Sequence, residues 1–145
     1  MHFNKIMTNL FIYIAVFSVI LLLVGNFSSY LYNNMKQITD ESTTISDFTK
    51  LDLYFLRLVK TDDIIIKKYG LVDKNDSSSY YITFQKEDGT TNTFIKIGNI
   101  IYYDKIKLCE NVESFKVMVD KSDKESISIE VKFLDKVYNS QYVLN

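Results

Sequence analysis

Cysteine, histidine, proline and tryptophan are nearly or wholly missing from this sequence of 145 residues, which has one Cys, one His, no Pro and no Trp. One cysteine forms no disulfide within the chain, and one cysteine with one histidine is too few for a structural zinc site. The only histidine, His2, is the second residue, which disfavours a Ser-His-Asp or Cys-His catalytic device. We therefore expect a protein that is not an enzyme and uses no metal and no cofactor.

Glycine is scarce as well, and charge of one sign does not dominate. The four glycines are scattered along the chain, so the clustered glycines of a phosphate-binding loop are absent. Seventeen basic and eighteen acidic residues give a net charge of −1. No basic field therefore indicates nucleic-acid binding, and a role in binding, anchoring or assembly is what the composition leaves open.

Charge is missing altogether from one long segment, because no residue from Ile6 to Met35 is charged. Its most apolar part, Leu10 to Val24, contains only one serine and one tyrosine among aliphatic and phenylalanine side chains. A membrane-spanning helix needs about 20 predominantly apolar residues, and the segment exceeds that length. At a rise of about 1.5 Å per residue it would be roughly 45 Å long, so we expect the helix to leave the bilayer before its first charge.

Three interpretations compete for this segment. A secretory signal peptide fits the short basic start, but the apolar run is long and Val24-Gly25-Asn26 is a poor cleavage site. A buried core helix is disfavoured, because the rest of the chain is too short to surround it. We therefore predict a single-pass anchor in the cell membrane, with Lys5 and the amino terminus in the cytoplasm and residues 36–145 outside.

Small residues fall on one face of the predicted helix, where Ser18, Gly25 and Ser29 are spaced by seven and four positions. Such a face permits close approach of a second helix. Small residues also occur in membrane helices without that role, so both interpretations stay open.

The rest of the chain, 36–145, predicts a small extracytoplasmic α+β domain. Residues 33–46 are polar, and the first helix either breaks there or is followed by a linker. Apolar residues at helical spacing then predict an amphipathic helix over about 46–61, packed on the domain's own sheet. Cys109 is expected to be a small buried side chain.

An alternating apolar pattern begins at Ile64 and predicts strands over about 80–144. Glu87 to Thr90 is typical of a turn, and Gly98-Asn99 of a two-residue hairpin. Five or six strands with short links predict an antiparallel sheet with one face covered by the amphipathic helix. The individual strands are expected near 80–84, 93–97, 100–104, 115–119, 127–133 and 138–143.

A long apolar helix feeding a helix-on-sheet domain resembles the type IV pilin-like proteins, specifically the minor pilins and pseudopilins. Residues 14–21 are similar to the apolar segment that follows the prepilin cleavage site of that family. The pattern of residues 52–60 and the strand order that follows are similar too. The resemblance extends to competence pseudopilins of the ComGF type and to minor subunits of the GspJ and PilW type.

The resemblance implies a non-catalytic subunit of a filament used for competence DNA uptake, as a pilus, or in secretion. The subunit would be stored in the membrane and assembled there, by a membrane platform, with other pilin or pseudopilin subunits, and would reach the cell surface after assembly. DNA would be met only through the filament, and there would be no small-molecule substrate. The residues of the membrane and assembly helix would include Asn9, Ala15, Val16, Phe17, Ser18, Leu22, Gly25 and Ser29.

Three positions depart from the family's processing motif, which has Gly before the scissile bond, an aromatic residue after it, and Glu five residues into the mature helix. With residues 15–18 aligned, Asn4, Lys5 and Asn9 stand at those positions. Two interpretations fit these departures: a divergent minor subunit that is not cleaved, or a chain outside the family. The alternative function is a membrane-anchored binding or regulatory module unrelated to pili, which would work equally well on any other transmembrane helix.

Overall fold

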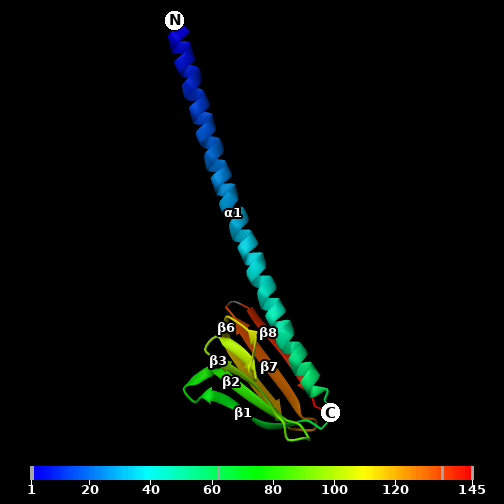
Figure 1. The fold of residues 1–145 in the computed structure, drawn as a ribbon. Helices are drawn as coiled ribbons and strands as arrows, with labels where there is room; N and C mark the ends of the chain where they lie inside the picture. Colours follow the sequence, from blue (N-terminus) through cyan, green and yellow to red (C-terminus); the bar gives the residue numbers. More distant parts are fainter. Residues whose placement is uncertain (1, 62, 135, 145) are drawn as a thin grey trace. The chain divides into compact units, whose positions relative to one another are not determined.

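A computed structural model describes residues 2–61, 63–134 and 136–144 of the chain. Within these residues a helix, α1 (His2–Val59), is followed by eight strands (Figure 1). The predicted α+β class is therefore confirmed. The chain divides into two compact units, Met1–Ser42 and Thr43–Asn145, and α1 contributes residues to both.

α1 continues without interruption through the polar residues 33–46, where we expected a break or a linker. A separate amphipathic helix over 46–61 is therefore not present, because those residues form the last turns of α1, which ends at Val59. The polar segment has neither glycine nor proline to interrupt the helix. Its side chains also bond within the helix: the Thr39 hydroxyl donates to the Met35 carbonyl (2.9 Å), and Gln37 Nε2 donates to Glu41.

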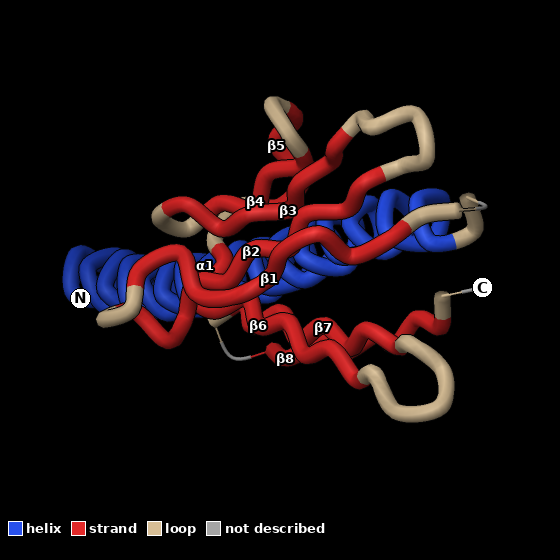
Figure 2. Tube along the Cα trace, turned by 90° about the horizontal axis from the view of Figure 1, so that it is seen from below, coloured by secondary structure: helices blue, strands red, loops and turns tan. Residues whose placement is uncertain are grey.

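The sheet is curled and mixed, with the strand order β5-β4-β3-β2-β6-β7-β8 and with β1 paired to β2. Figure 2 shows β3, β4 and β5 on one side of β2 and β6, β7 and β8 on the other. Neighbouring strands are antiparallel except β2 and β6, which meet in a parallel bridge between Ser79 and Phe115. The strands are β1 (Ile65–Asp73), β2 (Asp76–Gln85), β3 (Thr91–Ile97), β4 (Ile100–Tyr103), β5 (Ile106–Cys109), β6 (Val112–Asp120), β7 (Ser126–Phe133) and β8 (Lys136–Val143).

The prediction of the sheet was wrong in two respects. The sheet has eight strands instead of five or six, and it is not purely antiparallel. Two strands were not predicted: β1 is largely exposed and does not alternate, and β5 has only four residues. β2 begins earlier than expected, at Asp76, in a polar run that is typical of a loop. The expected turn and hairpin are confirmed, since the Lys86 amide donates to the Thr90 carbonyl (2.9 Å) and Gly98 has a φ of +61° between β3 and β4.

The core of the second unit lies between the last turns of α1 and the sheet. Phe55 is fully buried, and its ring stacks on those of Phe94 and Tyr142, with centroids 3.9 and 5.2 Å away. The Phe84 ring meets it edge-on at 6.1 Å. This aromatic cluster joins α1 to three strands, and aromatic pairs of this geometry contribute about 0.5–1.5 kcal/mol each beyond area burial.

Two aspartates of α1 add polar contacts to the strands. Asp52 Oδ1 accepts hydrogen bonds from the Ser140 hydroxyl (3.0 Å) and the Tyr142 hydroxyl (2.5 Å) of β8. Asp47 Oδ2 accepts from the Glu110 amide (3.1 Å), just beyond β5. Hydrogen bonds to a charged acceptor are stronger than neutral ones, so these contacts fix α1 against both ends of the sheet order.

Replacement of Phe55 by alanine should destabilise the second unit by about 3–5 kcal/mol, because it removes a buried ring and leaves a cavity. The matched control is Leu53→Ala on the same turn, where the side chain is 56% exposed and the expected loss is below about 1 kcal/mol. Urea unfolding of the full chain in detergent, followed by tyrosine circular dichroism, measures both. Equal losses for the two variants would contradict the placement of Phe55.

Candidate functional site

The most prominent surface feature of the described structure is the exposed apolar surface of α1. Every side chain from Asn4 to residue 33 is exposed, including Phe17 and Leu22, at 61% and 69%. Within the described residues, α1 provides one stretch that is long and apolar enough to cross a membrane, and none of that stretch is buried. Monomeric soluble proteins rarely expose contiguous apolar patches larger than a few hundred Å². The surface therefore needs an apolar environment, either lipid or other chains.

The residues assigned to assembly lie on different sides of α1. Spacings of three and four positions place Ala15, Ser18, Leu22, Gly25 and Ser29 on one side. Asn9 and Val16 lie on the opposite side, because each residue turns the helix by about 100°, and Phe17 points between the two sides. The helix thus brings together the small residues predicted from the sequence, but not the whole predicted set.

Two hydroxyl side chains in the apolar part of α1 are hydrogen-bonded to the helix backbone. The Ser18 hydroxyl donates to the Ile14 carbonyl at 2.8 Å, and the Thr8 hydroxyl donates to the Asn4 carbonyl at the same distance. In hydrocarbon an unpaired polar group costs several kcal/mol, so these internal bonds make the two hydroxyls compatible with lipid. At Gly25 an added Cβ would meet no atom within 4 Å, so no contact in the described structure requires glycine there.

The two positions at the degenerate processing motif, Asn4 and Lys5, lie in the first turns of α1, and both side chains are exposed. They precede the apolar stretch directly. Lys5 is the only residue with a charged side chain before Lys36, so it supplies the side-chain charge at the amino-terminal end of the apolar segment.

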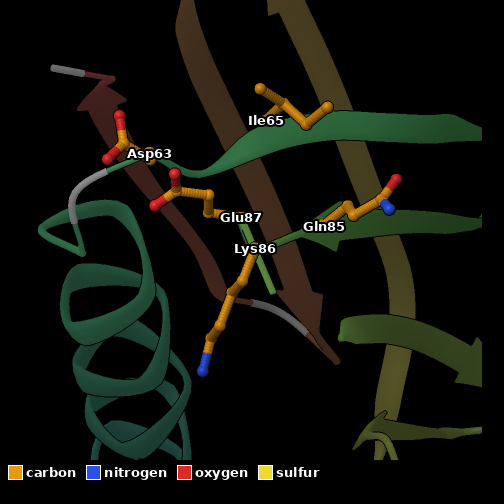
Figure 3. A pocket seen from close by; sticks show the side chains of 5 residues that line it. All are labelled: Asp63, Ile65, Gln85, Lys86 and Glu87. Atoms are coloured by element: carbon orange, nitrogen blue, oxygen red, sulfur yellow. The ribbon is translucent and has the colours of Figure 1, made fainter. Parts of the chain in front are cut away.

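The second unit has a pocket of about 320 Å³ at the ends of β1 and β2, drawn in Figure 3. Its lining combines two carboxylates, an amide, an amine and one isoleucine: Asp63, Gln85, Lys86, Glu87 and Ile65. All five side chains are exposed or half-buried. Solvent therefore screens their charges, and none of the charged groups is desolvated. The described residues contain no group of three or more His, Cys, Asp or Glu placed to hold a metal ion.

A polar cluster at the junction of β2, β3 and β6 was not predicted from the sequence. Lys96 is only 4% exposed, and its Nζ donates to the Ser79 hydroxyl (3.1 Å) and the Gly98 carbonyl (2.6 Å). The Ser79 hydroxyl in turn donates to Asp76 Oδ2 (2.6 Å). A hydrogen bond from the hydroxyl of Ser78, joined by the one from Ser79, lowers the pKa of Asp76 to about 2.

This cluster stabilises structure and does not activate a nucleophile. The Ser79 hydroxyl donates to Asp76, whose lowered pKa makes its carboxylate a weak base, and it accepts from an ammonium, which has no lone pair to take a proton. An activated serine needs a neighbouring base strong enough to take its proton. Ser79 also forms the parallel bridge to Phe115, so the buried lysine fixes the point where the two halves of the sheet meet. An alternating-pattern analysis misses it because Lys96 sits at a core position of β3.

Cys109 is buried, as predicted, and its thiol donates to the carbonyl of Asp47 (3.2 Å). Burial, assisted by the negative charge of Asp47, raises the pKa of Cys109 to about 12. Since the thiolate is the reactive form, this thiol is unreactive at neutral pH.

In the folded chain, Cys109 should therefore resist iodoacetamide at pH 8, and its modification should become measurable only as the pH approaches 12. Urea should restore the reactivity of an ordinary thiol, because unfolding removes the burial. Mass spectrometry of the intact chain measures the rate, with Ser122→Cys in an exposed turn as the reactive control. Folded-state modification of Cys109 at the rate of that control would contradict the burial.

Comparisons of the chain with protein-family models, with curated proteins and with solved structures find no match. The fold and the exposed helix define its class: an α+β domain joined to a helix that is long and apolar enough to cross a membrane.

Proposed function

We propose that the chain is a non-catalytic, single-pass membrane subunit of a type IV pilus-like filament, a minor pilin or pseudopilin. The observation that carries this proposal is the exposed apolar surface over residues 4–33, on the same helix whose last turns complete the core of the α+β domain. A plain anchor needs only a hydrophobic span. A filament subunit needs a helix that serves both lipid and neighbouring subunits, and α1 has the surface for both.

The length of the uncharged segment supports this dual use. Residues 6–35 extend over about 45 Å of helix, whereas the hydrocarbon core is about 30 Å thick. Exposed apolar side chains beyond the span, among them Leu31 and Ile38, would therefore lie outside the lipid in the membrane-stored state. These side chains would be available to neighbouring subunits while the subunit is stored in the membrane and also after it has left the membrane for the filament.

Assembly in this proposal exchanges lipid contacts for helix–helix contacts. Without a hydrophobic driving force between helices in lipid, their association depends on close packing and hydrogen bonds, which small residues favour. The side of α1 that carries Ser18, Gly25 and Ser29 is the side on which another helix can approach most closely. Lys5 would hold the amino terminus in the cytoplasm and place the α+β domain outside.

A membrane-anchored binding or regulatory module is the second candidate. It is favoured by the departures from the processing motif, where Asn4, Lys5 and Asn9 replace the glycine, the aromatic residue and the glutamate of the family. The two candidates differ in what they require of α1. Exchange of residues 6–33 for an unrelated transmembrane helix should abolish assembly in a filament subunit. A function that survives the exchange would favour the anchored module.

Lysine at both Val16 and Leu22 should remove the protein from the membrane fraction and abolish filament assembly. Each charge near the bilayer centre costs about 2.5–3.5 kcal/mol and also removes an apolar side chain from the span. Membrane fractionation and electron microscopy of filaments in the source cell measure the two losses. The control is Leu53→Lys, an exposed position in the second unit, which should change neither. Normal filaments with both lysines in place would refute the proposal.

A further inference from the structure

Three strands of the second unit have an edge that pairs with no other described strand: β1, β5 and β8. A free edge presents a row of unpaired backbone N–H and C=O groups, which is a template for pairing with another chain. Proteins protect such edges with short strands, bulges or charges. The three edges of this sheet differ in whether they have that protection.

β1 and β5 are both protected. β1 has register shifts between Ile66 and Lys68 and between Leu71 and Asp73, and Lys67 and Lys68 lie in its middle. β5 is four residues long and is followed directly by Glu110. Bulges, lysines and short length are the usual means of preventing edge-to-edge pairing.

β8 lacks this protection over its last seven residues, 137–143. All eight of its residues pair with β7 in one unbroken register, from Lys136 opposite Phe133 to Val143 opposite Ser126. From Val137 to Val143 the strand has no charge, and these two valines are 50% and 49% exposed. A regular, uncharged edge of this length is suited to pairing with a further strand.

The backbone groups that face outward along β8 can be assigned. The Leu144 amide donates to the Glu125 carbonyl at 2.9 Å, so the backbone of residue 144 points toward β7. Successive residues of an antiparallel strand alternate in this direction, and the register has no shift. The outward groups are therefore those of Val137, Asn139, Gln141 and Val143.

The order of side chains along this edge is self-complementary. Residues 137–143 read Val-Tyr-Asn-Ser-Gln-Tyr-Val, which is symmetric in chemical type about Ser140. We infer that β8 pairs antiparallel with β8 of a second copy of this chain, with Ser140 opposite Ser140 of the other copy. Val137 then faces Val143, Tyr138 faces Tyr142, and the Asn139 amide faces the Gln141 amide.

The outward backbone groups fit this register. Val137 opposite Val143 and Asn139 opposite Gln141 are pairs in which both residues point outward, so each pair exchanges two hydrogen bonds. The two-fold axis at Ser140 repeats them, and the closed pairing makes about eight backbone hydrogen bonds. The interface is isologous, as in most homodimers, and leaves no free β8 edge. This inference does not rest on membrane anchoring.

A cysteine at the centre tests the register directly. In the paired state Ser140 lies opposite its own copy at a non-hydrogen-bonded position, where the two Cα atoms are about 4.5 Å apart, close enough for a disulfide. Full-length Ser140→Cys in detergent should become a disulfide-linked dimer under mild oxidation. Asn139→Cys is the matched control: its two copies would be more than about 7 Å apart, too far to bridge, so it should form no disulfide-linked dimer.

Equal crosslinking of Ser140→Cys and Asn139→Cys, or no crosslinking of Ser140→Cys in a folded chain, would overturn the inference. Circular dichroism checks the fold, since Ser140→Cys loses one of the two hydrogen bonds to Asp52. The buried, high-pKa thiol of Cys109 contributes no crosslink.

Introducing charges at two exposed positions of β8 provides a second measurement, and exposed substitutions leave the fold intact. The double variant N139K/Q141K would set lysine opposite lysine twice and should raise the dimer dissociation constant about tenfold or more. The variant N139K/Q141E would set lysine opposite glutamate twice and should restore association to the wild-type level or better. Energy transfer between labelled full-length chains measures both. Association that is the same in all three proteins, or not restored in N139K/Q141E, would overturn the inference.

Discussion

Water cannot surround the apolar side chains of residues 6–33 without a large free-energy cost, and all of them are exposed on α1. This constraint organises the rest of the molecule. The apolar side chains have to be covered by lipid or by other chains. The hydroxyls of Thr8 and Ser18 are compatible with either environment, because they already bond to the helix backbone.

The other end of the same helix is partly buried instead of exposed. From Asp47 onward α1 buries one side against the sheet, with Phe55 stacked between Phe94 and Tyr142 and with Asp52 bonded to β8. One helix therefore supplies the apolar surface of the first unit and part of the core of the second. A substitution in its last turns changes the core of the second unit, whereas one in residues 6–33 changes the exposed apolar surface on which the proposed membrane residence and assembly depend.

Periodicity predicts the elements of this fold whose burial follows a simple pattern. β7 alternates between buried Ile127, Ile129 and Val131 and more exposed residues, and it was expected at its observed place. The unbroken helix was not expected, because the polar residues 33–46 suggested a boundary although they contain no helix-breaking residue. The parallel bridge from Ser79 to Phe115 depends on a buried lysine that binds a serine, and no local pattern predicts it. The apolar surface of residues 4–33 was predictable from composition. The free edge of β8 could be recognised only once the strand order was known.

Hydrogen exchange of the full chain in phospholipid vesicles tests whether a span of about 20 residues within 6–33 of α1 lies in lipid. Backbone amides over about residues 10–27 should be strongly protected, with exchange rising beyond Lys36, because lipid excludes water from the span. The sheet amides should exchange equally in vesicles and in detergent. Amides over 10–27 that exchange as fast as those of residues 36–45 in vesicles would contradict the claim.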